Sequence, residues 1–352
     1  MMSVEWFEAA IAAHQAGDLA TALRKIRRAV RAFVRSDGAR HPDTANARLE
    51  LGRILIARGA LAQGVRELEA ATRALRSIQH PVGDVADLVV HAELVTSAAL
   101  RLSGKYAKAR RHASAALVRA ARGDVGPSWF AAAHNELGVI GKFDGHFADA
   151  DRHYRAAVPL VRRLYGARSR EMATLWHNLG GLDHARGRHR AGERAARRSV
   201  EIGREVLPAH HLELIAHEVA HAALLDELGQ PTASLPIYRR ALRAYRAAGD
   251  AYEVASVLHD LAAAEHSLGA RTRARRRYAD ALAGYRRTVG AAHPDVGRTL
   301  HNLAMLEADD GHHARAATLF RRAAHVLRAS LGAAHPITRA TLAGAHRLAK
   351  AR

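Results

Sequence analysis

The sequence has no cysteine, no long apolar run and few aromatic residues, which make up 5% of the chain. Without cysteine, disulfides, thiolate catalysis and iron–sulfur clusters are excluded. No stretch approaches the roughly 18 uninterrupted apolar residues that a membrane-spanning helix needs. The first residues lack the basic leader and apolar core of a signal peptide, so we expect a cytoplasmic protein. Glycine-rich phosphate loops of the GxGxxG or GxxxxGK type are also absent.

The 352-residue chain is instead rich in apolar and basic residues. Hydrophobic residues make up 49%, which suffices for a sizeable core, and 54 Lys and Arg stand against 34 Asp and Glu. The formal net charge is +20, and it comes almost entirely from arginine because only five residues are lysine. Length alone would suggest two or three domains.

A repeat runs through the whole chain, marked by glycines that each follow one helical apolar run and precede another. From Gly17 to Gly311 there are seven steps with a mean spacing of 42 residues. The positions seven before, five after and twelve after each glycine hold only Gly, Ala or Ser, as close helix approach requires. Apolar spacings of three and four predict helices, so each unit reads helix, glycine turn, helix. The glycines are Gly17, Gly59, Gly104, Gly145, Gly187, Gly229, Gly269 and Gly311.

This pattern resembles the tetratricopeptide repeat family over essentially the whole chain, and the 42-residue period resembles its kinesin-light-chain-like subgroup. The segments that carry the resemblance are LHNLAMLEADDGHHARAATLFRRAAHVLRASLGAAHP (300–336), LHDLAAAEHSLGARTRARRRYADALAGYRRTVGAAHPD (258–295) and LWHNLGGLDHARGRHRAGERAARRSVEI (175–202). The unit around Gly104 departs most, because Thr96 and Ala113 replace larger apolar groups. The resemblance implies an all-α, right-handed superhelical α-solenoid, with first helices lining a concave surface and second helices a convex one.

We predict a single solenoid domain over residues 1–352, with about eight repeats and a capping helix at 337–350 that covers the last apolar face. No room remains for a separate catalytic domain, which overrides the estimate from length. The repeats are predicted at residues 3–40, 43–80, 84–126, 128–168, 170–207, 211–249, 251–292 and 294–334.

One motif favours an enzyme instead, because residues 217–221 read H-E-x-x-H. On a helix, His217 and His221 face one side and can share a zinc ion, and Glu218 would polarise a metal-bound water. The repeat explains most of this motif, since HEVA (217–220) aligns with HDLA (259–262). We therefore expect no enzyme, cofactor or metal, and keep a zinc-dependent hydrolase as an alternative.

The resemblance also implies a binding surface, because three recurring positions of the first helices face the concave groove in such repeats. Asparagine can bond both groups of a peptide backbone, and His and Arg favour an acidic or hydrogen-bond-accepting ligand. The candidate groove residues are Asn135, Lys142, His177, Asn178, His184, His259, His266, Arg298, His301 and Asn302.

From these residues we expect a non-catalytic scaffold or adaptor that binds a protein or extended peptide. The family resemblance implies a regulator or target in a bacterial signalling or defence system. The oligomeric state stays open, with a monomer favoured, and no membrane partner is expected.

The arginines lie mainly on the predicted second helices. Such clusters attract nucleic acid or acidic proteins through the net field, but they are not interleaved with aromatic residues that could stack bases. We interpret them as a solvated convex face and keep nucleic-acid binding through the convex arginines as a second alternative. The clusters are Arg24, Lys25, Arg27, Arg28 and Arg31; Arg194, Arg197 and Arg198; and Arg271, Arg273, Arg275, Arg276 and Arg277.

Overall fold

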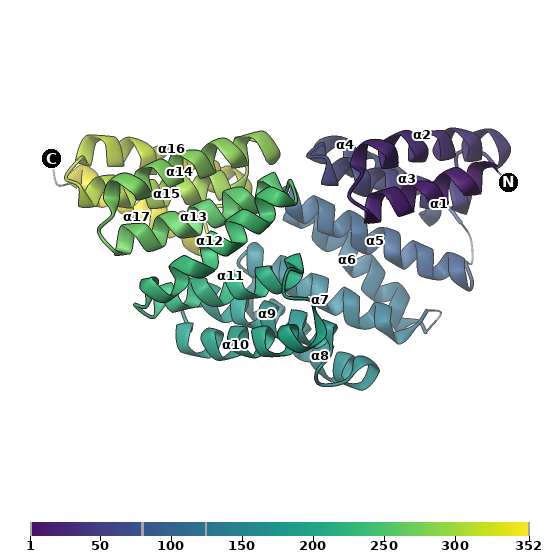
Figure 1. The fold of residues 1–352 in the computed structure, drawn as a ribbon, viewed down its shortest axis with the longest axis horizontal. Helices are drawn as coiled ribbons and strands as arrows, with labels where there is room; N and C mark the ends of the chain where they lie inside the picture. The colour runs from purple at the N-terminus through teal and green to yellow at the C-terminus, as the bar shows by residue number, and fades with distance from the viewer. Residues whose placement is uncertain (1, 79–80, 124, 351–352) are drawn as a thin grey trace. The chain divides into compact units, whose positions relative to one another are not determined.

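The computed structural model describes residues 2–78, 81–123 and 125–350, and this part of the chain folds into seventeen helices without a strand (Figure 1). His80 and Asp124, within the predicted second and third repeats, lie outside the described residues. The helices are α1 (Met2–Gln15), α2 (Leu19–Ser36), α3 (Pro42–Ala57), α4 (Leu61–Arg76), α5 (Asp84–Leu102), α6 (Tyr106–Ala121), α7 (Pro127–Phe143), α8 (Phe147–Tyr165), α9 (Arg170–Ala185), α10 (His189–Val206), α11 (Leu212–Glu227), α12 (Pro231–Ala247), α13 (Ala251–Ser267), α14 (Arg271–Thr288), α15 (Pro294–Asp309), α16 (His313–Leu331) and α17 (Pro336–Lys350).

The predicted all-α repeat fold is confirmed, and its glycines act as predicted. Each of the eight recurring glycines joins a first helix to a second helix and has a positive φ between 70° and 85°. An L-residue with a side chain rarely adopts this conformation, so glycine ends each first helix at little cost.

The helices form two layers. The even-numbered second helices α10, α12 and α14 each contact the first helix of their own repeat and the first helix of the next repeat. First helices also contact one another directly, as in the pairs α9–α11, α11–α13 and α13–α15. The first helices are therefore the inner layer and the second helices the outer layer.

The chain divides into two compact units, Met1–Ile140 and Gly141–Arg352, called unit 1 and unit 2 below. In unit 1 the first repeats pack around Ile26, Phe33 and Ile54. In unit 2 the cores of later repeats contain Tyr238, Tyr278 and Phe320. The single domain over residues 1–352 that the sequence predicts stays a prediction.

The repeat around Gly104 is the least regular in sequence, because Thr96 stands where most repeats have a larger apolar residue. The structure gives the hydroxyl of Thr96 a hydrogen-bond partner. The hydroxyls of Thr96 and Thr72 are 2.8 Å apart in the buried contact between α5 and α4. Ala113, the other small replacement, is fully buried. The departure from the pattern therefore leaves no unpaired hydroxyl at Thr96.

Small residues let α9 and α10 cross closely in unit 2. A Cβ at Gly192 would lie 3.0 Å from the Gly180 carbonyl oxygen and 2.9 Å from a methyl of Leu224. We expect Gly192→Leu to lower the free energy of unfolding by about 2 kcal/mol, because the added side chain overpacks this crossing. Urea denaturation would measure the loss, with the exposed Ala279→Leu on α14 as a control that should change little. Equal effects of the two substitutions would contradict this explanation of the small-residue positions.

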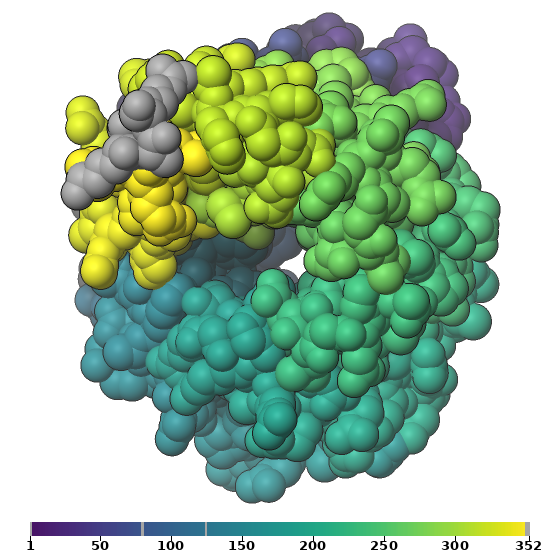
Figure 2. All heavy atoms as spheres, turned by 90° about the vertical axis from the view of Figure 1, so that its left-hand side faces the viewer, coloured from purple at the N-terminus to yellow at the C-terminus, as the bar shows by residue number. Residues whose placement is uncertain are grey.

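Unit 2 closes on itself around a central hollow. A Cβ at Gly145, in the α7–α8 turn, would lie 2.9 Å from the ring of His335, which directly precedes α17. Residues about 190 positions apart therefore touch, and Figure 2 shows the teal beginning of unit 2 beside its yellow end around the opening. The His335 Nδ1 accepts a hydrogen bond from the Ile337 amide at 3.3 Å, which caps α17.

Candidate functional site

The first helices that line the hollow of unit 2 are strongly acidic. Helices α9, α11, α13 and α15 carry twelve Asp and Glu but two Lys and Arg. The second helices of the same unit, α8, α10, α12, α14 and α16, carry 24 Lys and Arg against six Asp and Glu. The convex arginines are found where sequence analysis places them, whereas the acidic inner layer is a finding of the structure.

Two of the predicted groove histidines tie neighbouring repeats together. His259 on α13 lies 2.9 Å, through Nδ1, from the Thr299 hydroxyl on α15. Its Nε2 lies 3.2 Å from the Asn302 amide nitrogen. The Thr299 hydroxyl already donates to the Asp295 carbonyl at 2.7 Å, so His259 donates from Nδ1 and accepts at Nε2. Burial lowers the pKa of His259 to about 3, and the ring is neutral at pH 7.

His301 makes the same kind of link one repeat later. Its Nδ1 lies 2.9 Å from the Thr341 hydroxyl on α17, and its ring packs edge-on against Phe320. Burial lowers the pKa of His301 to about 4. Both histidines therefore serve as neutral connectors between first helices.

A further histidine pair lies between α9 and α11. The rings of His177 and His217 are 5.1 Å apart, and the Nδ1 atom of each has no hydrogen-bond partner among the described residues. Burial holds the pKa of His177 well below its usual range, helped by His217 and Lys142. Burial also lowers the pKa of His217 to about 4. Lys142, on α7, acts on His177 through its charge, and its Nζ would lie 3.1 Å from a Cβ placed on Gly181.

The other predicted groove residues take different places. Asn178 is only 6% exposed and belongs to the packed interior, and Asn135 lies on the part of α7 that belongs to unit 1. Three others face acidic partners: His184 lies 3.5 Å from Glu227, His266 lies 3.0 Å from Asp309, and Arg298 lies 3.2 Å from Asp295. A binding role for the ten residues stays a prediction.

Two carboxylates in the inner layer of unit 2 lack partners. Glu253 and Asp260 on α13 make no side-chain hydrogen bond or ion pair with any described residue. Burial raises the pKa of each to about 7. Arg298 opposes this shift at Asp260, while Asp226 reinforces it. The sequence held a signal for Asp260, since it takes the place nine before the glycine that Asn178 and Asn302 take in other repeats.

Asp226, on α11, is an acid of the same layer whose oxygens are bonded. It accepts hydrogen bonds from the Ser234 hydroxyl and, at 2.7 Å, from the Tyr238 hydroxyl. Burial raises the pKa of Asp226 to about 6 despite these bonds. The inner layer therefore offers hydrogen-bond acceptors, and negative charge above neutral pH.

The H-E-x-x-H segment on α11 sends its side chains to separate partners. Glu218 is buried and accepts from Arg204 at 3.0 Å and from Arg240. His221 lies 3.1 Å from Glu193, and His217 packs on the ring of His177. In the described part of the chain, neither histidine belongs to a group of three ligands that could hold a metal. Such a group is formed on the surface by Asp37, His41 and Asp43.

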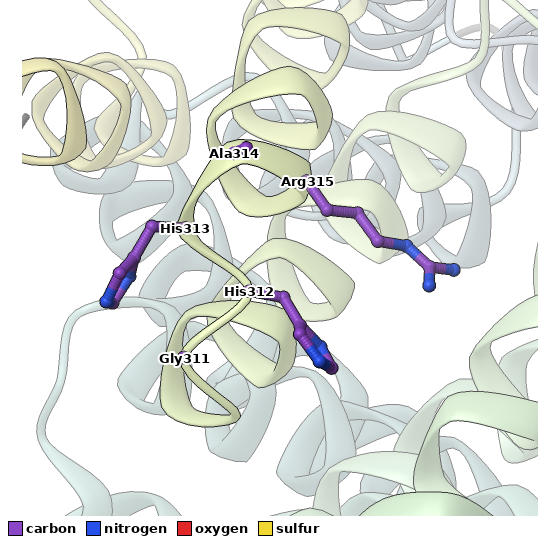
Figure 3. A pocket seen from close by; sticks show the side chains of 5 residues that line it. All are labelled: Gly311, His312, His313, Ala314 and Arg315. Carbon is purple, nitrogen blue, oxygen red and sulfur yellow. The ribbon is translucent and has the colours of Figure 1, made fainter.

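The α15–α16 turn forms an open depression lined by Gly311, His312, His313, Ala314 and Arg315 (Figure 3). His312 and Arg315 extend to one side of the turn and His313 to the other. His312 and Arg315 both pair with the buried Glu307, at 2.8 Å and 3.5 Å. The depression is thus the outer edge of an ion-pair cluster. None of the described helices is long and apolar enough to cross a membrane.

Solved structures with a similar fold include two Rap proteins and a quorum sensor. A Rap protein complexed with competence and sporulation factor shares 12% identity at a TM-score of 0.62, covering 87% of this chain and 86% of that one. The apo form of RapI shares 11% identity at a TM-score of 0.63, covering 82% and 98%. The apo quorum sensor NprR from B. thuringiensis shares 14% identity at a TM-score of 0.52, covering 87% and 80%. At these identities the likeness concerns the fold alone.

The family comparison agrees with the repeat analysis. No curated protein matches the chain in sequence. The tetratricopeptide repeat pattern matches residues 171–247 and 253–329. These two segments cover α9–α12 and α13–α16, where helix pairs, glycine turns and small-residue crossings all recur. Residues 171–247 and 253–329 are thus tetratricopeptide repeats.

Proposed function

We propose that the protein is a non-catalytic scaffold that binds an extended peptide or protein segment in the hollow of unit 2. The fold supports this proposal, since a structural neighbour is a Rap protein in complex with competence and sporulation factor. Repeat arrays of this kind also present a preformed surface, which limits the ordering cost of binding. The likeness to Rap and NprR supports a regulatory role in signalling.

The chemistry of the inner layer favours a ligand with a basic side chain. The lowered pKa values of His259 and His301 leave these rings uncharged at pH 7, so they give no charge basis for an acidic ligand. Glu253 and Asp260 are carboxylates without a side-chain hydrogen bond or ion pair to any described residue. A partly buried charge is costly unless it is paired, and an arginine or lysine of a bound segment would supply a pairing charge. This unpaired acidic pair is the observation that carries the proposal.

A displayed library of random peptides selected on the immobilised protein tests this proposal. We expect selected sequences to be enriched in Arg and Lys, and a synthetic selected peptide to bind in calorimetry. The double substitution Glu253→Gln with Asp260→Asn should lower the affinity for that peptide by about tenfold or more, since a charged hydrogen bond is lost.

The matched control changes two exposed acids of the outer layer, Glu201→Gln with Asp280→Asn, and so alters net charge equally. This control should retain binding. Selection without basic enrichment, or equal affinity for all three proteins, would contradict the proposed site.

A further inference from the structure

We propose that the outer face of α12, α14 and α16 binds the phosphate backbone of duplex nucleic acid. The proposal concerns the surface opposite to the hollow and does not depend on peptide binding there. It rests on the distribution of charge between helix layers, on the exposure and lack of ion pairs of particular arginines, and on the side chains that this face lacks.

The two helix layers carry opposite charge along the whole chain. The eight second helices, α2 to α16, hold 37 Lys and Arg against eight Asp and Glu. The eight first helices, α1 to α15, hold six Lys and Arg against 20 Asp and Glu. A basic genome-wide bias would raise arginine in both layers, so the net charge of +20 conceals a strongly cationic outer surface.

On three neighbouring second helices of unit 2, many arginines are exposed and free. Eight exposed arginines of these helices form no ion pair or hydrogen bond with a described residue. A ninth, Arg321, donates a hydrogen bond to the Thr318 hydroxyl. Across this face α12 and α16 contain no acidic residue, and α14 contains only Asp280. The arginines are Arg239, Arg243 and Arg246 on α12; Arg276, Arg286 and Arg287 on α14; and Arg321, Arg322 and Arg328 on α16.

Helix stability explains only part of this set. Cations in the last turn interact favourably with the helix dipole, which accounts for Arg246, Arg286 and Arg328. It does not account for arginines in the middle of the helices, such as Arg243, Arg276 and Arg322. Like charges three or four residues apart on one helix repel each other slightly, so Arg239, Arg243 and Arg246 together favour an anion outside the helix.

The arrangement suits a polyanion that is rigid and extended. Arg239 and Arg246 are seven residues apart, about 10 Å along the helix axis. The free arginines of three helices therefore form a two-dimensional array rather than a single row. Arginine also binds phosphate oxygens with two parallel hydrogen bonds, which lysine does not.

The absence of exposed large apolar and aromatic side chains on this face narrows the class of polyanion that it could bind. None of the exposed large apolar side chains lies on α12, α14 or α16, so the face has no anchor to insert into a lipid layer. It also has no exposed aromatic ring on which single-stranded bases could stack. Backbone contact with a duplex needs neither feature and carries little sequence preference.

The basic helix α2 in unit 1 is a weaker candidate and supplies a control. Its six cations lie on a single helix without acids. The next second helix, α4, carries Glu67 and Glu69 among its three arginines, so the positive surface is interrupted there. Arg24, Arg28 and Arg31 are exposed on α2, and reversing them changes the net charge as much as reversing three arginines of unit 2.

The test measures fluorescence anisotropy of labelled DNA and RNA duplexes of about 24 base pairs, titrated with the full chain over a series of salt concentrations. We expect binding whose affinity falls steeply with salt. Arg243→Glu, Arg276→Glu and Arg322→Glu together, one on each helix, should weaken binding by at least about thirtyfold. They should also reduce the slope of log affinity against log salt by about three, one for each lost phosphate contact.

The control with Arg24, Arg28 and Arg31 changed to Glu should lose less than about threefold, and circular dichroism should show that both variants keep their helices. Equal losses in the two variants would mean that net charge, not this face, governs binding. Tighter binding to phosphatidylserine vesicles, single strands or polyglutamate than to either duplex would assign the face to another partner. Each of these outcomes, and absence of duplex binding, overturns the proposal.

Discussion

Replacing Glu307 by glutamine is expected to lower the free energy of unfolding by about 3 kcal/mol, since it removes the charge from a buried ion pair. Glu307, on α15, is fully buried. Its oxygens lie 2.8 Å from Arg275 Nε and 2.8 Å from His312 Nδ1, with Arg315 at 3.5 Å. Burial raises the pKa of Glu307, but the bonds from Arg275 and His312 prevail and leave it below its usual value.

The loss should depend on pH. A carboxyl with a lowered folded-state pKa stabilises the fold above its unfolded pKa, and the contribution disappears as pH falls through the folded value. The penalty of Glu307→Gln is therefore full at pH 7 and shrinks in acid. Urea denaturation of wild type and variant at pH 7 and in acid measures this penalty.

A matched control is Glu201→Gln, which removes the exposed pair between Arg198 and Glu201 at 3.4 Å on α10. An exposed pair contributes about 0.5 kcal/mol or less. Similar losses in the two variants would show that burial does not strengthen the Glu307 cluster. An unchanged penalty in acid would show that its charge is not what stabilises the fold.

The helical repeat could be predicted because its signals are local. Eight glycines, each with small residues at three fixed offsets, indicate both the turns and the helix crossings, and each glycine has the left-handed conformation that this reading requires. No long-range pairing had to be guessed, since helices α9 to α16 pack mainly on their neighbours in sequence. The division between Ile140 and Gly141 was not predictable in this way, because the repeat continues through α7 with the same pattern.

The site was harder to predict because it depends on contacts between repeats. The sequence pattern predicts that a histidine ten positions before a glycine faces the groove. In the structure, however, His259 and His301 are each hydrogen-bonded to a threonine 40 residues further along the chain. Position in the repeat does not show whether a side chain has a partner in the next unit. The same limit concealed the opposite case. Asp260 lies nine positions before its glycine, as Asn302 does, but it makes no side-chain hydrogen bond or ion pair with any described residue.

Replacing Glu253 by glutamine and Asp260 by asparagine is expected to stabilise the protein above neutral pH. Each carboxyl has a folded-state pKa of about 7, against roughly 4 when unfolded. Between these values the folded state holds protons that the unfolded state has released, so wild-type stability from these groups falls as pH rises from about 4 to 7. The double variant lacks this loss. At about 1.4 kcal/mol per pKa unit, three units in each of two groups give a gain at pH 8 of up to about 8 kcal/mol.

The comparison of urea midpoints at pH 5 and pH 8 isolates this effect. Other groups, such as Glu93 in unit 1 with its lowered pKa, stabilise the fold as pH rises, but they act equally in wild type and variant. The difference between the two proteins should therefore be small at pH 5 and large at pH 8. A difference that is the same at both pH values would show that the two carboxyls are already charged in acid, and that burial does not penalise them.

The same titration links stability to binding. If a basic peptide supplies the missing partner, its affinity should increase from pH 6 to pH 8 as Glu253 and Asp260 ionise, and the bound peptide should lower both pKa values. A pH-independent affinity together with the expected stability gain would separate the two roles, because the acids would then be costly to the fold without contacting the ligand. Affinity that rises with pH in wild type, and is flat in the double variant, would show that charges which destabilise the empty hollow are the ones that recognise its ligand.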